Sequence, residues 1–406
     1  MVRTIVGGVT APRGFKAAGV SCGIKKAKPG ARAPLDLALL AAGAPVSTAA
    51  VFTTNKAIAA PIVVSREHLE QTGGWVRAVV TNSGCANAAT GAQGLAAARE
   101  MAGVTAQALG CEADEVLVAS TGVIGVQLDV ARIKAGVASA VDVLRVDGAQ
   151  DAARAIMTTD PFPKSTAAAI DTPGGTLTVG GMAKGSGMIE PRMATMLAFL
   201  TTDARVEPRV LGVALQRVVN ATFNAITVDG ECSTNDCVML LASGESGVAI
   251  THANDPRLME PLMHVAGHLA REIVRGGEGA TKLVAVDVIG AATQEDAWLA
   301  ARTIANSPLV KTAIHGGDPN WGRLIAAAGR SGAAFRLDRA SVSIGHVKLF
   351  ADGTPHDERA DEAAAVMQTP EMTITVDLGV GGRYSATMWT CDFSAEYVRI
   401  NAEYRT

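Results

Sequence analysis

Apolar residues recur at two different spacings along this chain, and the two spacings alternate from one end to the other. Segments 92–110 and 208–223 carry apolar side chains three or four positions apart, which places them on one face of a helix. Segment 75–84 instead has the pattern of a strand that runs into a polar turn. Because helices and strands are mixed, without the strict strand-helix-strand rhythm of a dinucleotide-binding domain, the pattern predicts a layered α/β fold.

Two further strand regions bear on function. Val116–Val118 reads as a short buried strand, and the small residues Ser120, Thr121 and Gly122 after it predict that the strand ends there in a turn. Near the end of the chain, segments 371–379 and 383–393 alternate apolar and polar residues. They are predicted to form an antiparallel pair.

Composition excludes several functions. The chain has 406 residues, a formal charge of −3, 48% apolar and 18% charged residues, so it is long enough for one large domain or two and is not disordered. The near-neutral charge argues against nucleic acid or an anionic membrane as a partner. No apolar run reaches the roughly 18 residues of a membrane span, and the N-terminus lacks a signal-peptide core, so a cytoplasmic location is predicted. The six scattered cysteines are expected to be reduced.

Most common catalytic motifs are absent. The chain contains no GxxxxGK[ST] phosphate loop, no GxGxxG fingerprint and no GxSxG elbow, so no cofactor is predicted. His264 and His268 have the spacing of metal ligands on a helix, but no HExxH glutamate accompanies them, and a packed or solvated helix face explains them better. No metal site is predicted, and a serine or cysteine nucleophile would lack an obvious histidine base.

A threonine could act without that histidine. The stretch KGSGMIEPRMATMLAFLTTDA, Lys184–Ala204, passes from small residues through a proline into an apolar run and contains Thr195. Thr195 could be an ordinary strand residue. An N-terminal threonine, however, carries its own base, because its α-amine has a pKa of about 7.7–8.0. Thr195 would have that amine only if the chain were cut before it.

This stretch resembles the self-cleaving segment of the glutamate N-acetyltransferase family, also called the ornithine acetyltransferase family. Eight further stretches resemble the family in the same order, so the resemblance spans nearly the whole chain. They are VFTTN (Val51–Asn55), TNSGCANAATG (Thr81–Gly91), ASTGVIG (Ala119–Gly125), IMTTDPFPK (Ile156–Lys164), NAITVDGECSTND (Asn224–Asp236), GGEGATK (Gly276–Lys282), IHGGDPNWGR (Ile314–Arg323) and INAEYRT (Ile400–Thr406).

The resemblance implies a self-cleaving acetyltransferase of arginine biosynthesis, with a sandwich of sheets between helix layers. It implies a cut between Ala194 and Thr195, which would give an alpha fragment, 1–194, and a beta fragment, 195–406, that together form one intertwined catalytic unit. Thr195 would be the nucleophile that carries the acetyl group from N-acetylornithine to glutamate. The implied oxyanion hole is Thr121 and Gly122. The implied substrate contacts are Thr158, Lys184, Thr195, Glu278, Asn401 and Thr406.

Some of these residues also fit their implied roles chemically. Lys184 could be a solvated charge, but a lysine also suits a site that binds carboxylates or lowers the pKa of an amine. Glu278, between two glycines, could be an exposed loop acid or the partner of a substrate ammonium. The sequence does not choose between Thr158 and its neighbour Thr159. His315 is expected to lie in a structural loop near the site.

Two departures from the family pattern stand out. The family usually has asparagine where this chain has Arg192, three residues before Thr195, and this leaves the rate of self-cleavage open. The family commonly has DGDTSTND where this chain has DGECSTND. Glu231 keeps the charge and Cys232 is close in size to threonine, so little effect is expected from them.

The resemblance further implies an oligomer, expected to be a dimer of alpha–beta heterodimers that acts on small molecules. It leaves open whether acetyl-CoA is a second donor. An N-terminal-nucleophile peptidase or amidase of similar fold is the main alternative, since such enzymes also cut themselves. A binding protein that has lost the chemistry is a third hypothesis, against which the intact Ala194–Thr195 pair argues.

Overall fold

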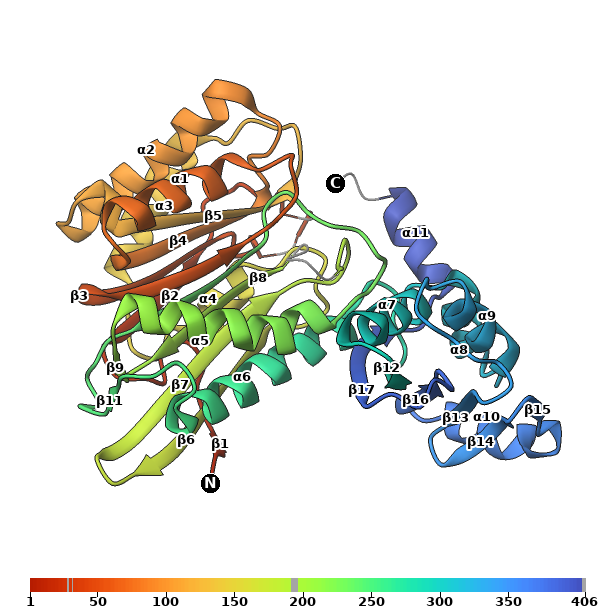
Figure 1. Ribbon diagram of the computed structural model, residues 1–406. Coiled ribbons are helices and arrows are strands. Elements are labelled where there is room, and N and C mark those ends of the chain that lie inside the picture. The colour runs from red at the N-terminus through yellow and green to blue at the C-terminus, as the bar shows by residue number, and fades with distance from the viewer. Residues whose placement is uncertain (28, 31, 191–195, 404–406) are drawn as a thin grey trace. The chain divides into compact units, whose positions relative to one another are not determined.

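The computed structural model describes residues 1–27, 29–30, 32–190 and 196–403. They divide into two units (Figure 1). Among the described residues, the first consists of 1–224 and 231–273, and the second of 225–230 and 274–403.

In the described part of the first unit, nine strands form one sheet in the order β1-β6-β7-β8-β10-β3-β4-β5, with β2 paired to β3. The short strands β9 and β11 form a separate parallel pair. The strands are β1 (Arg3–Ile5), β2 (Phe15–Val20), β3 (Leu37–Phe52), β4 (Trp75–Cys85), β5 (Val116–Val123), β6 (Lys164–Thr172), β7 (Gly175–Lys184), β8 (Leu197–Thr202), β9 (Arg205–Val206), β10 (Cys237–Ala242) and β11 (Ala249–Ile250).

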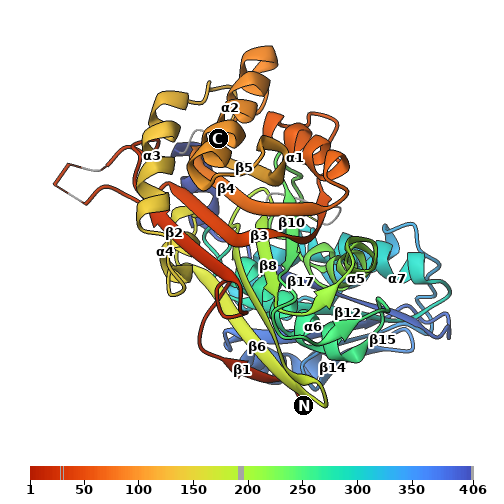
Figure 2. The same ribbon diagram turned by 90° about the vertical axis from the view of Figure 1, so that its left-hand side faces the viewer.

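Helices cover both faces of this sheet, and Figure 2 shows α1, α2 and α3 lying over β3, β4 and β5. The helices are α1 (Ala60–Gln71), α2 (Gly91–Leu109), α3 (Val130–Asp142), α4 (Ala149–Ala155), α5 (Pro208–Ala221) and α6 (Pro256–Arg275). The predicted helices at 92–110 and 208–223 are α2 and α5. Helix α2 ends at Gly110, whose φ of 67° is the left-handed conformation that terminates helices.

Alternate residues of the central strands enter different cores. Leu37 and Leu39 of β3 pack with α2 and α3 in one core, whereas Ala38 and Leu40 pack with α4 in the other. A strand with both faces covered needs apolar residues at successive positions, which explains the continuous apolar run LALL. The first unit is therefore a sheet between helix layers.

The strand that carries Thr121 is longer than its sequence predicts. β5 continues through Ser120 and Gly122, so the prediction that it ends there in a turn is wrong. The reason is pairing: Thr121 and Gly122 lie opposite Ser83 and Gly84 of β4, in parallel register. Small polar residues signal a turn only where no neighbouring strand is present to pair with them.

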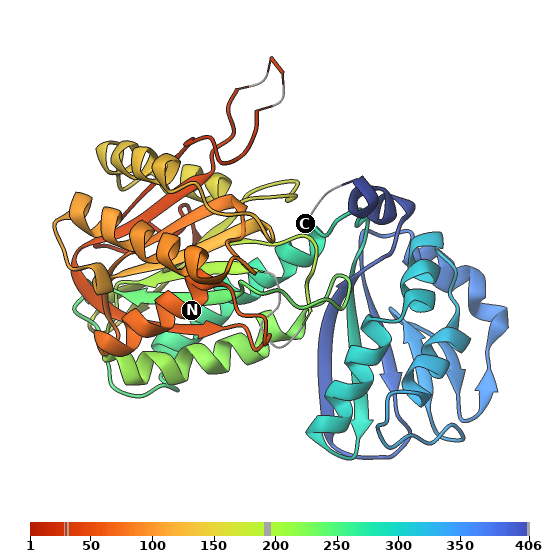
Figure 3. The same ribbon diagram turned by 90° about the horizontal axis from the view of Figure 1, so that it is seen from above.

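In the described part of the second unit, six strands form a sheet in the order β15-β14-β13-β16-β12-β17. Figure 3 shows the helices coloured teal to cyan along one face of this sheet. The strands are β12 (Leu283–Ala291), β13 (Ser341–Ile344), β14 (Val347–Ala351), β15 (Thr354–Pro355), β16 (Glu371–Asp377) and β17 (Tyr384–Cys391). The helices are α7 (Gln294–Ala305), α8 (Pro308–Gly316), α9 (Trp321–Gly329), α10 (Ala360–Met367) and α11 (Ala395–Glu403).

The last two long strands do not pair with each other, and that prediction is wrong. β12 lies between them, parallel to β16 and antiparallel to β17. Their alternation reflects a sheet with one face under the helices. In β16, Met372, Ile374 and Val376 are buried there, whereas Thr373 and Thr375 between them are only half-buried. Alternation reveals which face of a strand is buried, but not which strand lies beside it.

The layered α/β prediction is confirmed at the level of fold class. Within the described residues, no helix is both long enough and apolar enough to cross a membrane. All six cysteines are free thiols, and Cys237 is fully buried. The expected fragments 1–194 and 195–406 concern a covalent cut and stay a prediction. β7 and β8, which lie on opposite sides of the expected cut, are antiparallel neighbours in the same sheet.

Candidate active site

Several of the family-like stretches converge where neighbouring strands of the first sheet begin or end. The Asn235 amide donates to the carbonyl of Ala86, at 2.6 Å, and to that of Ser120, at 2.9 Å. Thr53 Oγ1 donates to the carbonyl of Ser233, at 2.8 Å. Stretches far apart in the sequence are thus held together by side-chain to backbone hydrogen bonds around the end of β5, where Thr121 lies.

The segment Thr121–Gly122 has a backbone that accepts only glycine at its second position. Gly122 has φ of +125°, and a Cβ there would lie 2.4 Å from the carbonyl carbon of Gly84 on β4. Both the conformation and the close approach exclude a side chain. Thr121 is buried, with 5% of its surface exposed. The backbone around the expected oxyanion hole is therefore held closely against β4.

Lys184 lies beside Thr121. It is the last residue of β7, only 3% exposed, and its Nζ donates to Thr121 Oγ1 at 3.3 Å. β7 pairs with β8 so that Lys184 lies opposite Leu197, and β10 pairs with β8 so that Cys237 lies opposite the same Leu197. The beginning of β8 is therefore flanked by Lys184 on one side and by the beginning of β10 on the other.

The next residue group surrounds Asp160, which the sequence reasoning missed as a site residue. Asp160 Oδ1 accepts from Lys164 Nζ at 2.6 Å and from the Gly185 amide at 2.8 Å. Burial alone would raise the pKa of Asp160, but Lys164 and Lys184 lower it to about 2. A carboxylate ionised in this way fixes the segment that follows Lys184.

The contacts around the same carboxylate distinguish Thr158 from Thr159, between which the sequence did not choose. The Thr158 amide donates to Asp160 Oδ2 at 3.0 Å, and the Thr158 hydroxyl has no hydrogen-bond partner among the described residues. The Thr159 hydroxyl is bonded to that of Ser186 at 2.6 Å. Thr158 therefore has the hydroxyl that could bind a substrate, as the resemblance implies.

Asp236 is the second carboxyl group that the sequence reasoning missed. Its side chain is buried, with 1% of the residue exposed, and Oδ1 accepts from the Met196 amide at 2.9 Å. Oδ2 is buried without a hydrogen-bond partner among the described residues. Burial raises the pKa of Asp236 well above its usual value, although the Met196 amide and the charge of Lys184 oppose the rise. A buried carboxyl group with a raised pKa holds its proton more tightly than an exposed one, which is typical of groups that take part in proton transfer.

Three of the predicted site residues, Ala194, Thr195 and Thr406, lie outside the described residues, as does Arg192. Their predicted roles stay predictions. Met196, the first described residue after them, is held by Asp236, and the strand that it precedes runs between β7 and β10.

In the second unit, Glu278 and Asn401 form a pair. Glu278 is 8% exposed, and its Oε2 accepts from Asn401 Nδ2 at 2.8 Å. Asn401, on α11, also donates to the carbonyl of Tyr397 at 3.0 Å. The structure thus brings together the two predicted substrate contacts of this unit. The amide orients one carboxylate oxygen of Glu278, and an amide leaves the charge of that carboxylate unneutralised.

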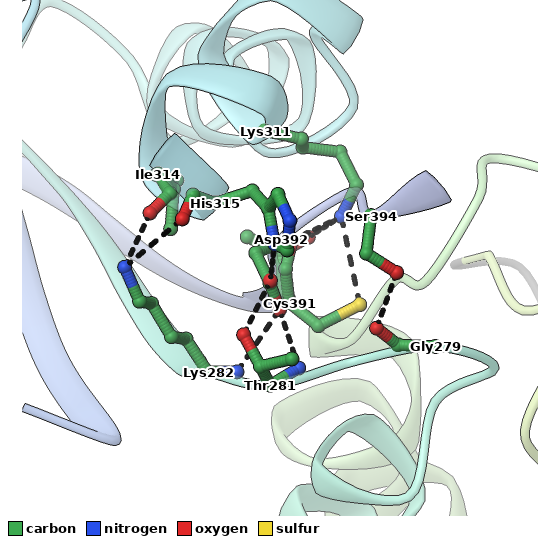
Figure 4. A network of polar contacts seen from close by, with 10 residues as sticks. Gly279, Thr281, Lys282, Lys311, Ile314, His315, Cys391, Asp392 and Ser394 are labelled. Atoms are coloured by element: carbon green, nitrogen blue, oxygen red, sulfur yellow. Dashed lines mark hydrogen bonds and ion pairs between the residues drawn. The ribbon is translucent and has the colours of Figure 1, made fainter. Parts of the chain in front are cut away.

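The loop that carries Glu278 is held by one buried carboxylate, Asp392 (Figure 4). Asp392 Oδ1 accepts from the backbone amides of Thr281 and Lys282, at 2.7 and 2.9 Å. Its Oδ2 accepts from the hydroxyl of Thr281, at 2.6 Å. Burial would raise the pKa of Asp392, but these bonds and that with His315 hold it below its usual value.

His315 is part of the same network, which gives it a position that the sequence did not provide. Its Nδ1 lies 2.7 Å from Asp392 Oδ2. His315 belongs to the C-terminal end of α8 and not to a loop, so that expectation is corrected. The turn-forming residues after it end the helix, with Gly317 at a φ of 68°. His315 is a structural partner of the loop of Glu278, because it contacts the same Asp392 carboxylate that binds Thr281 and Lys282 of that loop.

A further contact fixes the loop from the other side. Ser394 Oγ donates to the carbonyl of Gly279 at 2.7 Å. Gly279 has φ of +69°, and a Cβ there would lie 2.6 Å from the amide nitrogen of Tyr397. The loop is therefore packed directly against the beginning of α11, which carries Asn401.

The histidine pair on α6 does not form a metal site in the described structure. His264 Nε2 lies 2.9 Å from Thr4 Oγ1. The described residues contain no group of three or more histidine, cysteine, aspartate or glutamate side chains placed to hold a metal ion. The packed or solvated helix face expected for this pair agrees with the contact of His264.

A family model described as the ArgJ family matches residues 16–406. The chain is 50% identical over 401 residues to the arginine biosynthesis bifunctional protein ArgJ of Chlorobaculum tepidum, a match that covers 97% of this chain and 96% of that protein. It is 48% identical over 414 residues to the protein of the same description from Symbiobacterium thermophilum, with 99% of each chain covered.

Among solved structures, the chain is similar to ornithine acetyltransferase of Mycobacterium tuberculosis complexed with ornithine. That match has 40% identity and a TM-score of 0.41, and it covers 47% of this chain and 98% of that chain. The family model and the relatives that match over nearly their full length establish the family. The chain belongs to the ArgJ family.

Proposed function

We propose that this chain transfers an acetyl group from N2-acetyl-L-ornithine to L-glutamate, as an acyltransferase of arginine biosynthesis. Membership of the ArgJ family supports the reaction. The observation that carries the mechanism is the position of Lys184, whose Nζ reaches Thr121 and whose strand flanks the beginning of β8. Met196, the residue directly after Thr195 in the sequence, is held by Asp236 just before the beginning of β8.

The first step in this proposal is self-cleavage. Thr195 Oγ attacks the carbonyl carbon of Ala194, the bond between that carbon and the Thr195 nitrogen breaks, and the hydroxyl proton ends on the nitrogen. The resulting ester is hydrolysed by water, which leaves Ala194 as a carboxylate and Thr195 with a free α-amine. The fragments 1–194 and 195–406 stay associated, because β7 of the first and β8 of the second are neighbours in one sheet.

Acetyl transfer then uses the new amine as base. The Thr195 amine takes the Oγ proton, and the oxygen attacks the acetyl carbonyl of acetylornithine. Thr121 and Gly122 stabilise the oxyanion, a contribution of about 3 kcal/mol for one good donor. Ornithine leaves, and the amine of glutamate takes the acetyl group from Thr195. Transfer in place of hydrolysis requires that water reach the ester poorly.

The substrate-binding roles follow from charge. Both substrates carry an α-carboxylate, whereas the side chain of ornithine is cationic and that of glutamate is anionic. Lys184 supplies a positive group, and Glu278, oriented by Asn401, supplies a negative one. The Thr158 hydroxyl and the carboxylate of Thr406 complete the proposed contacts.

The remaining parts of the proposal concern partners. No cofactor takes part, and acetyl-CoA would be an alternative donor substrate. The cleaved chain would form a dimer of alpha–beta heterodimers in the cytoplasm, without a nucleic acid or membrane partner.

One experiment separates this proposal from its alternatives. The purified chain is analysed by denaturing mass spectrometry and then incubated with acetylornithine, with and without glutamate. Two fragments that begin at Met1 and Thr195, and acetylglutamate formed only when glutamate is present, would support the transferase. Release of free acetate independent of glutamate would favour a hydrolase of the N-terminal-nucleophile type. An uncut chain without activity would favour a binding protein.

A further inference from the structure

Lys25 is a half-buried cation that no motif pointed to. It lies in the connection between β2 and β3, and its Nζ donates to the carbonyl of Leu35 at 2.9 Å and to that of Met157 at 2.7 Å. Asp36 holds the backbone of this connection, since its two carboxylate oxygens accept from the amides of Cys22, at 2.6 Å, and Lys25, at 2.9 Å. The Lys25 side chain is therefore directed inward.

The neighbours of Lys25 are those of the candidate site. Met157, whose carbonyl binds its ammonium, directly precedes Thr158. A Cβ on Gly84 would lie 2.9 Å from Lys25 Cγ, and Gly84 is the residue against which Gly122 is packed. The aliphatic part of Lys25 thus passes over the glycine that supports the expected oxyanion hole.

No ion pair with another described residue neutralises the charge of Lys25. Asp160 and Lys184 both act on it electrostatically, but Asp160 is already bonded to Lys164 and to two backbone amides. Burial lowers the pKa of Lys25 to about 8, against the attraction of Asp36 and Asp160.

An ammonium group has three N–H donors, and the two carbonyls use two of them. The third has no hydrogen-bond partner among the described residues. A half-buried ammonium with an unused donor is a binding position for an anion, because a desolvated cation gains most from a charged acceptor. The two carbonyls hold the group in place, so it cannot withdraw when a substrate enters.

We propose that Lys25 binds the α-carboxylate that the acetyl donor and the acetyl acceptor have in common. This inference rests on the proposed function. The transferred acetyl group is attached to the α-nitrogen, so the α-carboxylate must lie close to the oxyanion hole in both half-reactions. The end of the substrate side chain lies farther away, and its charge changes sign between ornithine and glutamate. The α-carboxylate is thus the charge that stays constant and lies near the oxyanion hole, and it matches a fixed cation beside Gly84, the residue that packs against Gly122.

The test replaces Lys25 by methionine in the full chain and uses Lys26 as the matched control, because Lys26 is adjacent and exposed. Acetylation of Thr195 by acetylornithine and its discharge by glutamate are followed separately. Lys25→Met should raise KM about 10- to 100-fold in both half-reactions, the range for a hydrogen bond to a charged group. Lys26→Met should leave both unchanged. A Lys25→Met enzyme with unchanged KM, or with a change in only one half-reaction, would overturn the proposal.

A substrate analogue separates binding from a structural role. Acetylornithine with an α-carboxamide in place of the carboxylate should be a poor donor for the wild-type chain. It should lose little further in Lys25→Met, because the group that distinguishes acid from amide is gone. Equal discrimination in both enzymes would contradict the assignment. Lys25→Gln, which can still donate to one carbonyl, serves if Lys25→Met does not fold.

The pH dependence gives a third readout. Asp36, Asp160 and Lys184 face Lys25, so the ammonium titrates within a group of charges. The wild-type KM for acetylornithine should rise as the pH increases through about 8, where Lys25 loses its proton, and this rise should be absent in Lys25→Met. A wild-type chain without any transfer activity would instead count against the proposed function, which keeps the two failures distinct.

Discussion

Asp236 Oδ1 accepts a hydrogen bond from the Met196 amide at 2.9 Å, while its Oδ2 is buried without a hydrogen-bond partner among the described residues. Leaving a buried polar atom unsatisfied costs about 1–3 kcal/mol. The carboxyl group is hydrogen-bonded to the backbone of Met196, the second residue after the expected cleavage point. A carboxyl group so close to the expected cut has a position from which it could take part in the cleavage chemistry.

Asp236→Asn should slow self-cleavage at least tenfold, because a buried carboxyl group can give a proton to the departing amide nitrogen and an amide cannot. The variant keeps an oxygen for the Met196 amide, so the fold is retained. The cleaved fraction is measured over time by mass spectrometry. Asp203→Asn is the matched control: Asp203 is also 1% exposed and accepts a backbone amide, that of Thr178, at 2.8 Å. Equal cleavage in the two variants would exclude a proton-transfer role for Asp236.

The same substitution has an expected effect on stability. The pKa of Asp236 is raised in the folded chain, so the folded state binds the proton more tightly than the unfolded state does. Its stabilising contribution is complete below the unfolded pKa of about 3.9 and is lost as the pH rises through the folded pKa. The change in Tm that Asp236→Asn causes is measured in the uncut Thr195→Ala chain. It should therefore be more favourable at pH 7 than at pH 4. The opposite trend in thermal unfolding would show that folding lowers the pKa of Asp236 instead of raising it.

Thr195→Ala should stay whole and inactive, because both proposed steps use the same oxygen. Thr195→Ser should keep part of each activity, since it retains a hydroxyl and, after cleavage, an α-amine. N-terminal sequencing and an acetylglutamate assay measure the two outcomes. Active wild-type protein whose only N-terminus is Met1 would place the nucleophile elsewhere.

Glu278→Gln should weaken the use of acetylornithine more than that of glutamate. The cationic side chain of ornithine would lose its partner, at about 2–5 kcal/mol if the pair is desolvated. The half-reactions, followed separately, measure this. Asn401→Ala keeps the charge of Glu278 and removes only the amide that orients it, so a smaller effect in the same direction is expected. Equal losses in both half-reactions for Glu278→Gln would mean that Glu278 serves chemistry common to the two steps.

Asp392→Asn should loosen the loop of Glu278 and lower stability by about 1–3 kcal/mol at neutral pH. The pKa of Asp392 is lowered in the folded chain, so its contribution is present above the unfolded pKa of about 3.9 and is lost as the pH falls through the folded value. The difference from the wild type should shrink toward pH 3. Asp287→Asn is the control, because Asp287 also links β12 to β17, through Thr387, but is remote from the loop. Chemical unfolding measured against pH would decide, and a pH-independent difference would contradict the prediction.

Helices and fold class could be predicted because periodicity records which faces of a segment are buried. The pairing of β16 with β12, and the continuation of β5 through Gly122, could not, because both depend on a neighbouring strand that is distant in sequence. The family resemblance identified Thr121 and Lys184 as site residues, and the structure then showed that they contact each other at 3.3 Å.

The residues that the sequence reasoning missed share a cause. Lys25 and Lys26 are adjacent and identical in type, and the hydrogen bonds to the carbonyls of Leu35 and Met157 distinguish the half-buried Lys25 from the exposed Lys26. Asp160 and Asp236 stand within family-like stretches, so their neighbourhood gave a signal. Their burial, which perturbs their pKa values, follows only from the assembled sheet.

The strand order of the first sheet also governs how the chain can be made. β10 is inserted between β8 and β3, although β3 is among the first strands to be synthesised and β10 is the last of this sheet. A ribosome that has completed only the first 194 residues has therefore produced a sheet whose long strands β3 and β7 each lack a neighbour. Unpaired edges of that kind invite aggregation. The two fragments should consequently need to be synthesised as one chain. If they were expressed from separate messages, each would expose strand edges that pair with the other fragment in the complete sheet.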